Sequence, residues 1–272
     1  MMFIFLHNQT CGQFVTLSAD FCVSPKRERM KIYKFKDLSV PQLPAHFYQI
    51  VLYNTIWCAK PDDLNDEEEF RFKIDYKPSS STTGLLSQVI TKYKATNYLP
   101  PQLSASSVIE RNKLEEIAIP IIDDLIKKCR DTIGIVSFSI TKTDDHLWSE
   151  YGGKGNGVCI EMNIPDSLVN KSYWPVSYVP EKIFHIDSFL ESALFEDRTF
   201  NTYRNILLTK TKRWSQEEEI RFIANRQEVN LILDGYISEI TFGTHVQADT
   251  LRQVEGNIIN HCNANNIKII KL

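Results

Sequence analysis

The sequence lacks closely spaced cysteines. Its six cysteines are scattered along 272 residues, and no C-x-x-C pair occurs. This spacing excludes a zinc knuckle and a dense disulfide framework as the basis of the fold. Four of the cysteines lie in apolar or helical contexts and are expected to be small buried residues: Cys58, Cys129, Cys159 and Cys262. Free buried thiols fit a reducing compartment, so we expect a cytoplasmic protein.

Metal, hydrolase and phosphate motifs are also missing. The histidines show no H-E-x-x-H spacing, so we predict no metal site. No G-x-S-x-G elbow is present, which leaves a hydrolase serine unsupported. The glycine-rich run Gly152–Gly157 lacks the G-x-x-x-x-G-K-[ST] spacing and leads into an expected strand. We therefore expect it to be a flexible turn from a helix to a strand, at the rim of a pocket.

The chain has neither a strong excess of charge nor a long hydrophobic run. Its 31 basic and 34 acidic residues give a formal net charge of -3. This balance provides no global attraction to nucleic acid or to anionic membranes. The apolar opening Met1–Leu6 is too short for a signal core or a membrane span and has no basic flank. We predict no membrane partner.

The composition that is present, with 43% hydrophobic and 24% charged residues, is ordinary for a globular domain. Apolar periodicity predicts strands at residues 31–35, 55–59, 133–140, 157–163, 176–179, 217–224, 229–233, 236–242 and 267–270. It predicts helices at residues 44–53, 81–97, 105–130, 144–151, 188–209 and 248–263. Strands outnumber simple βαβ units, so we expect an α+β fold with a mixed or antiparallel sheet and flanking helices. The helices within residues 81–130 form an insertion or a flanking layer.

Strong patterning begins at Met30, and we expect residues 30–272 to form a single domain. Residues 1–29 form an N-terminal extension that ends in the charged run Pro25–Arg29. Two interpretations are open for this extension: an appendage, or an upstream start that is not the natural one. A strand within Phe14–Val23 is also compatible with its sequence.

The most informative segment is Lys210–Phe222, where acids, bases and a tryptophan precede an apolar stretch. If it is extended, Glu217, Glu219 and Arg221 share one face and the apolar residues go to the other. If it is helical, Glu217 and Arg221 form an i,i+4 ion pair worth a few tenths of a kcal/mol. Composition alone does not decide between these two interpretations.

A second polar cluster lies in the middle of the chain. Ser137 and Ser139 share one face of an expected strand, and Trp148 and Tyr151 follow in a short helix. Aromatic walls with a few orienting polar groups are typical of ligand pockets. For each residue taken singly, a purely structural role, such as Trp148 as a core anchor, is slightly favoured. The acidic run Asn65–Glu69 is expected to be mostly a solvated loop, with Asn65 and Asp66 able to hold a pocket edge through backbone hydrogen bonds.

Taken together, these pieces resemble the bacterial family known as domain of unknown function 2971, over nearly all of residues 30–272. The resemblance rests on Ile32–Phe35, Thr55–Trp57, Asn65–Asp66, Glu69, Ser137–Ser139, Leu147–Trp148, Tyr151, Gly157–Glu161, Lys210, Trp214, Glu217, Glu219 and Arg221. The chain departs from the family pattern in its acidic turn, where Glu67 and Glu68 replace a proline and a phenylalanine.

A weaker analogy is to ADP-ribosyltransferase-like toxins, which use a late-strand glutamate, often within E-x-E. This analogy implies NAD as a substrate, with Glu219 and Glu217 as candidate catalytic residues and Glu219 opposite a developing positive charge. It implies that Tyr33 or Tyr151 stacks on nicotinamide and that Lys34 or Arg221 holds phosphates. The full candidate ligand set is Tyr33, Lys34, Asn65, Ser137, Ser139, Trp148, Tyr151, Lys210 and Arg221.

Two functions follow as hypotheses. The first is a bacterial effector that binds a nucleotide such as NAD and transfers or cleaves it, in phage defence or a toxin system, on a protein or nucleic-acid target that stays unknown. The second is a non-catalytic ligand-sensing or interaction module, in which Glu217, Glu219 and Arg221 form a structural network. A nuclease is disfavoured because metal-ligand spacing and net positive charge are both absent.

Overall fold

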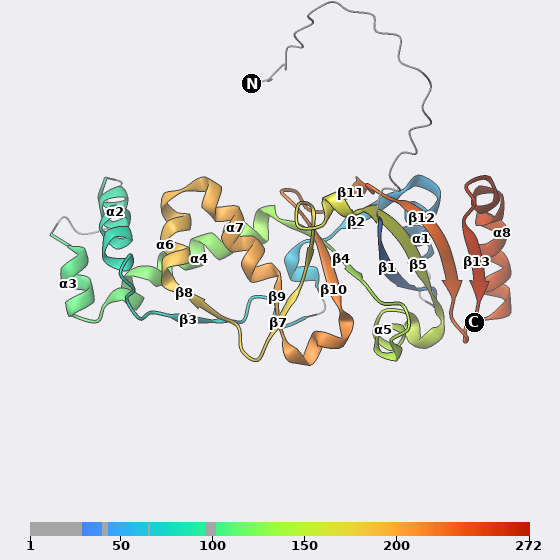
Figure 1. Ribbon diagram of the computed structural model, residues 1–272, viewed down its shortest axis with the longest axis horizontal. Helices are drawn as coiled ribbons and strands as arrows, with labels where there is room; N and C mark the ends of the chain where they lie inside the picture. Colours follow the sequence, from blue (N-terminus) through green and yellow to red (C-terminus); the bar gives the residue numbers. More distant parts are fainter. Residues whose placement is uncertain (1–28, 40–42, 65, 96–101) are drawn as a thin grey trace, which may run out of the picture.

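The computed structural model describes residues 29–39, 43–64, 66–95 and 102–272 (Figure 1). The expected extension up to residue 28, with its candidate strand within Phe14–Val23, lies outside the described residues. So does Asn65, one of the candidate ligand residues. In the described part, no helix is long and apolar enough to cross a membrane.

A seven-stranded sheet organises the molecule, with strand order β13-β12-β5-β1-β4-β10-β6. Its strands are β1 (Arg29–Asp37), β4 (Gly134–Ser139), β5 (Gly157–Pro165), β6 (Tyr173–Pro175), β10 (Glu219–Ala224), β12 (Tyr236–Phe242) and β13 (Lys268–Lys271). The named pairings are antiparallel except for β12 with β13, which is parallel. The fold is therefore α+β with a mixed sheet, as the sequence predicts.

Six shorter strands form two-stranded pairs beside this sheet. The pairs are β2 (Thr55–Cys58) with β11 (Val229–Ile232), β3 (Lys73–Asp75) with β8 (Ile183–His185), and β7 (Ser177–Val179) with β9 (Thr209–Thr211). Of these strands, β2, β7 and β11 agree with the strands predicted from the sequence, and the other three are not predicted. Strands of three residues are too short to show a period.

One face of the sheet is apolar and is covered by α1 (Leu43–Tyr53) and α8 (Ala248–Ala264). Ile32, Ile160 and Ile220 project from this face and pack in one core with Phe47 of α1 and Ile258 of α8. All five side chains are fully buried, at 0% exposure. Because side chains alternate along a strand, the neighbouring positions point to the opposite face, and there the sheet is unusually polar.

A helical lobe occupies the end of the molecule farthest from α8 (Figure 1). It contains α2 (Thr82–Lys94), α3 (Ala105–Glu110), α4 (Leu114–Thr132), α6 (Ile186–Leu194) and α7 (Glu196–Leu207). Their apolar faces form a second core. Within the lobe, the carboxylate of Asp187 joins α6 to the start of α2, because it accepts hydrogen bonds from the hydroxyls of Ser79, Ser81 and Thr82.

Two helices predicted as continuous are each divided in two. The helix expected over residues 105–130 breaks between α3 and α4, where Asn112 has a left-handed φ of 53°. Asparagine tolerates this conformation and ends helices readily. The helix expected over 188–209 breaks at Phe195, whose extended backbone separates α6 from α7. The four cysteines expected to be buried are free and buried.

The close approach of β4 to its neighbours generates a stability prediction. A Cβ at Gly134 would clash with the Arg226 carbonyl oxygen and would lie 2.5 Å from Cys58 Sγ. We expect Gly134→Ala to destabilise the protein by about 1–3 kcal/mol, because overpacking forces backbone shifts. The matched control is Gly256→Ala in the middle of α8, where a Cβ meets nothing within 4 Å. That change should stabilise by up to about 1 kcal/mol. Equal urea unfolding midpoints for the two variants would contradict the packing described.

Candidate functional site

Three strands bring candidate residues into one row on the polar face of the sheet. Tyr33 of β1 lies opposite Ser139 of β4, and Ser139 lies opposite Glu219 of β10. Arg221 lies opposite Ser137 in the same antiparallel ladder. Glu219 and Arg221 therefore share one face of an extended segment, as the extended interpretation predicts.

Glu217 does not belong to that strand, contrary to the predicted strand over 217–224. It ends the 3-10 turn η4 (Lys212–Glu217), and Glu218 then adopts a left-handed conformation with φ of 42°. This sharp turn starts β10 at Glu219. The Glu217 side chain still reaches the same buried cluster, but it arrives from the turn and not from the sheet.

Arg221 is held between two carboxylates and is 1% exposed. Its Nε and NH2 donate to Glu219 Oε1 and Oε2 at 2.7 and 3.1 Å. Its NH1 and NH2 donate to Glu69 Oε1 and Oε2 at 2.5 and 3.0 Å. NH1 also donates to the Leu207 carbonyl oxygen. Burial alone would lower the pKa of Arg221, but the two carboxylates raise it well above its usual value.

A second ion pair completes the cluster. Lys210 Nζ lies 2.7 Å from Glu217 Oε2 and 3.2 Å from Glu219 Oε2, and it sits 4.8 Å above the Trp214 ring. The Tyr151 hydroxyl donates to Glu217 Oε1 at 2.6 Å. Burial would raise the pKa of Glu219, yet the charges of Arg221 and Lys210 bring it down to about 2. Glu219 is therefore ionised, with both oxygens engaged by cations.

Glu69 was not singled out as a site residue, and its position corrects the expectation of a solvated acidic loop. Glu69 is 3% exposed and Asp66 is 6% exposed. Buried Lys182 holds this loop through hydrogen bonds to the backbone oxygens of Glu68 and Glu69, the latter at 2.9 Å. Asp66 Oδ1 caps the turn by accepting from Glu68 N at 2.9 Å.

The remaining candidates divide between the two faces. The Ser139 hydroxyl donates to the Glu217 carbonyl oxygen at 2.8 Å, which fixes η4 to β4. Tyr33 packs in a small apolar cluster with Leu147 of α5 (Asp145–Glu150). Lys34 follows Tyr33 and leaves the sheet on the apolar face, where its Nζ donates to the Ser137 carbonyl oxygen at 2.6 Å. Burial, followed by the charge of Lys36, lowers the pKa of Lys34 to about 7. Lys34 thus leaves the sheet on the opposite face from Glu219, although the charge of Glu219 partly offsets the lowering of its pKa.

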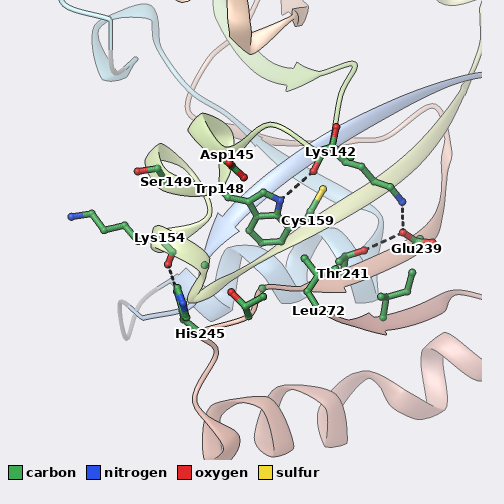
Figure 2. A pocket seen from close by; sticks show the side chains of 15 residues that line it. Lys142, Asp145, Trp148, Ser149, Lys154, Cys159, Glu239, Thr241, His245 and Leu272 are labelled. Atoms are coloured by element: carbon green, nitrogen blue, oxygen red, sulfur yellow. Dashed lines mark hydrogen bonds and ion pairs between the residues drawn. The ribbon is translucent and has the colours of Figure 1, made fainter.

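A cavity of about 650 Å³ lies on the polar face beside α5 (Figure 2). Cys159 of β5 and Thr241 of β12 line it, and Trp148 of α5 forms a wall. The turn η2 (Gly153–Gly155) lies at its edge with Lys154, in agreement with the predicted turn at a pocket rim. Among the candidate residues of the described chain, Trp148 is the one that lines this cavity.

The Trp148 ring has a fixed position. Its Nε1 donates to the Lys142 carbonyl oxygen at 3.1 Å, and its ring meets Phe35 edge to face at 5.2 Å. A Cβ at Gly152 would lie 2.7 Å from one ring carbon, and a Cβ at Gly243 would lie 3.0 Å from another. Glycine at these two positions leaves room for the ring.

Several polar residues that line this cavity are not predicted from the sequence, including Lys142, Glu239 and His245. Lys142 Nζ binds Glu239 Oε1 at 2.7 Å, and His245 Nδ1 donates to the Lys154 carbonyl oxygen at 2.8 Å. These residues come from separate turns and strands, so no local motif identifies them. In the part of the chain that the structure describes, no group of His, Cys, Asp and Glu side chains is arranged to hold a metal.

The buried cluster generates a prediction about stability. Arg221→Met leaves Glu69 and Glu219 facing each other without a cation, and breaking such a buried pair costs about 3–5 kcal/mol. The control is Arg252→Met, which removes an ion pair to Asp249 whose side chains are 75% and 90% exposed. That change should alter stability by less than about 1 kcal/mol. Equal stability of the two variants in urea unfolding would contradict the network described.

Comparison with known proteins identifies one family. Residues 147–222 match the model described as Protein of unknown function (DUF2971). No curated protein and no solved structure matches the chain. The match is shorter than the resemblance expected over residues 30–272. It contains Trp148 of the cavity and most of the buried cluster: Tyr151, Lys210, Glu217, Glu219 and Arg221. Through residues 147–222, the chain is therefore similar to the DUF2971 family of proteins of unknown function.

Proposed function

We propose that the protein is a ligand-recognition module that binds a nucleotide in the cavity beside Trp148. The observation that carries this proposal is the cavity itself. It has a volume of about 650 Å³ and combines a fixed indole wall with cationic side chains. Small-molecule sites typically have volumes of about 300–1,000 Å³, mostly apolar walls and a few placed polar groups. A nucleotide has the matching parts, because a flat base joins an anionic phosphate.

The base has an apolar and aromatic environment available. Trp148 offers its ring, and Ile270 and Leu272 of the C-terminal segment line the same cavity. Stacking of a base on an aromatic side chain contributes about 1–3 kcal/mol. Thr241 and Glu239 lie at the floor, where they can accept hydrogen bonds from the amino groups of a base.

The phosphate has a cation at the rim. Lys154 is exposed, and Figure 2 shows its side chain extending outward from the cavity edge. Lys142 is a poorer phosphate ligand, because its Nζ is already 2.7 Å from Glu239 and 3.7 Å from Glu161. A bound nucleotide therefore places its base inside and its phosphate toward Lys154.

In this proposal the Glu219–Arg221 cluster is structural. It joins β10 to the loop that carries Glu69 and to the turn that carries Glu217. Each carboxylate oxygen of Glu219 already faces a cation. The cluster thus positions the strands and α5, while the neighbouring cavity binds the ligand.

A second function is favoured by one observation, the alignment of Tyr33, Ser139 and Glu219 across adjacent strands. Here Glu219 stabilises the sugar of NAD while the bond from ribose C1′ to nicotinamide breaks. Nicotinamide leaves with the bonding electrons, and a nucleophile on the target bonds to C1′ and loses its proton. In this role the protein is an ADP-ribosyltransferase-like effector of a toxin or phage-defence system.

The first proposal predicts a specific loss of binding. In calorimetric titrations of the full chain with AMP, Trp148→Ala should weaken binding roughly 5- to 150-fold, the equivalent of one lost stacking contact. The control is Trp57→Ala on β2, because Trp57 is 37% exposed and does not line the cavity. Lys154→Asn should weaken AMP binding but leave adenosine binding unchanged, and asparagine tolerates the left-handed backbone at this position. Equal effects of the two tryptophan variants, or no AMP binding, would overturn the proposal.

The second function predicts that the protein releases nicotinamide from NAD. Chromatography measures this release in the presence of candidate protein targets. Wild type should release it, and Glu219→Gln should lower the rate at least about 100-fold, as expected when a transition-state charge partner is removed. Glu161→Gln is the control, since Glu161 is a buried carboxylate paired with Lys31 at 2.8 Å on the same face. NAD binding without any nicotinamide release would support recognition over transfer.

A further inference from the structure

A second cavity, of about 380 Å³, is lined by Glu67, His146, Arg213 and Trp214. His146 belongs to α5, the helix whose Trp148 lines the larger cavity. Arg213 and Trp214 belong to η4, and Glu67 comes from the acidic loop. Four side chains from three separated segments therefore converge on a space that the proposed nucleotide site does not use.

Hydrogen-bonding groups around this cavity are unused. Trp214 Nε1 and His146 Nε2 are buried and have no hydrogen-bond partner among the described residues. Their rings lie near each other, with centroids 6.3 Å apart. An unpaired buried donor costs about 1–3 kcal/mol, and such groups in native proteins call for an explanation. These two unpaired groups lie where α5 meets η4, at the wall of the second cavity.

Arg213 supplies a cationic group that is only loosely engaged. Its NH2 lies 3.3 Å from Glu68 Oε2 and 3.6 Å from Asp66 Oδ1. Both distances exceed the roughly 2.7–2.9 Å of a charge-assisted hydrogen bond. Its guanidinium carbon lies 5.0 Å from the centre of the Trp214 ring, and the side chain is 54% exposed. A planar guanidinium in this setting is suited to a carboxylate, which it binds through two parallel hydrogen bonds.

The surrounding charge excludes a simple anion site. One guanidinium faces three carboxylates, those of Asp66, Glu67 and Glu68. Asp66 Oδ2 is buried without a hydrogen-bond partner in the described chain, and Glu67 is exposed at the cavity wall. A ligand with only negative charge would meet these acids at close range. A ligand that also carries a positive group satisfies both sides.

We propose that this cavity binds a small zwitterion of the α-amino acid class. The carboxylate of the ligand pairs with Arg213, and its ammonium group faces Glu67. The Trp214 ring forms the apolar wall for its side chain. The ring is held in place by Lys210, which in turn is fixed by Glu217. This site is independent of the proposed nucleotide cavity.

The test uses the full chain and the twenty standard amino acids, screened by saturation-transfer NMR. At least one should bind, and both Arg213→Gln and Glu67→Gln should weaken that binding at least about fivefold. Both substituted side chains are exposed, so the fold should be retained. For the best ligand, the N-acetyl derivative, which lacks the ammonium, and the amide, which lacks the carboxylate, should each bind at least about fivefold more weakly.

Two controls separate this site from others. Arg198→Gln removes an exposed arginine in α7 and should leave binding unchanged. Trp148→Ala should also leave it unchanged, whatever its effect on AMP. The proposal is overturned if no amino acid binds, if the signal is insensitive to either Arg213→Gln or Glu67→Gln, or if the N-acetyl derivative binds as tightly as the free amino acid. The last result would identify an anion site.

Discussion

The rest of the structure depends on the guanidinium of Arg221, which is enclosed by the carboxylates of Glu69 and Glu219. An arginine at 1% exposure is tolerated only where every charge has a partner. Its five donors connect strand β10, the loop before β3 and the end of α7. Apolar packing against α1 and α8 fixes one face of the sheet, and this polar cluster fixes the other.

The helix α5 owes its position to the same cluster. Tyr151, at the end of this helix, donates to Glu217, and Leu147 packs on Tyr33 and Phe35 of β1. The helix thereby lies over the aligned strands, with Trp148 at one cavity and His146 at another. A helix of only six residues has little stability of its own, so these tertiary contacts determine where both cavities form.

Sequence periodicity predicted the central strands and the shared face of Glu219 and Arg221, because alternation is a local property of the chain. It also predicts Glu217 in the strand, because no residue pattern in the sequence indicates the left-handed turn at Glu218. It also treated the Asn65–Glu69 run as solvated. Glu69 and Arg221 are separated by 152 positions, and a single sequence contains no signal that pairs them. For the same reason, most residues of the cavity beside Trp148 are not predicted. Glu239, Thr241 and His245 come from a segment that is distant in sequence from Trp148.

The charges of the cluster bear on the choice between recognition and transfer. Arg221, Lys210 and Lys182 balance the carboxylates of Glu69, Glu217 and Glu219. A carboxylate that already faces two cations offers little additional field to a developing positive charge, because the cations cancel much of its potential at short range. For Glu219 to act on NAD, Arg221 or Lys210 must move away from it, and that movement removes contacts that hold η4 and the Glu69 loop. Recognition beside Trp148 requires no such rearrangement, and for this physical reason it is the function that the geometry supports best.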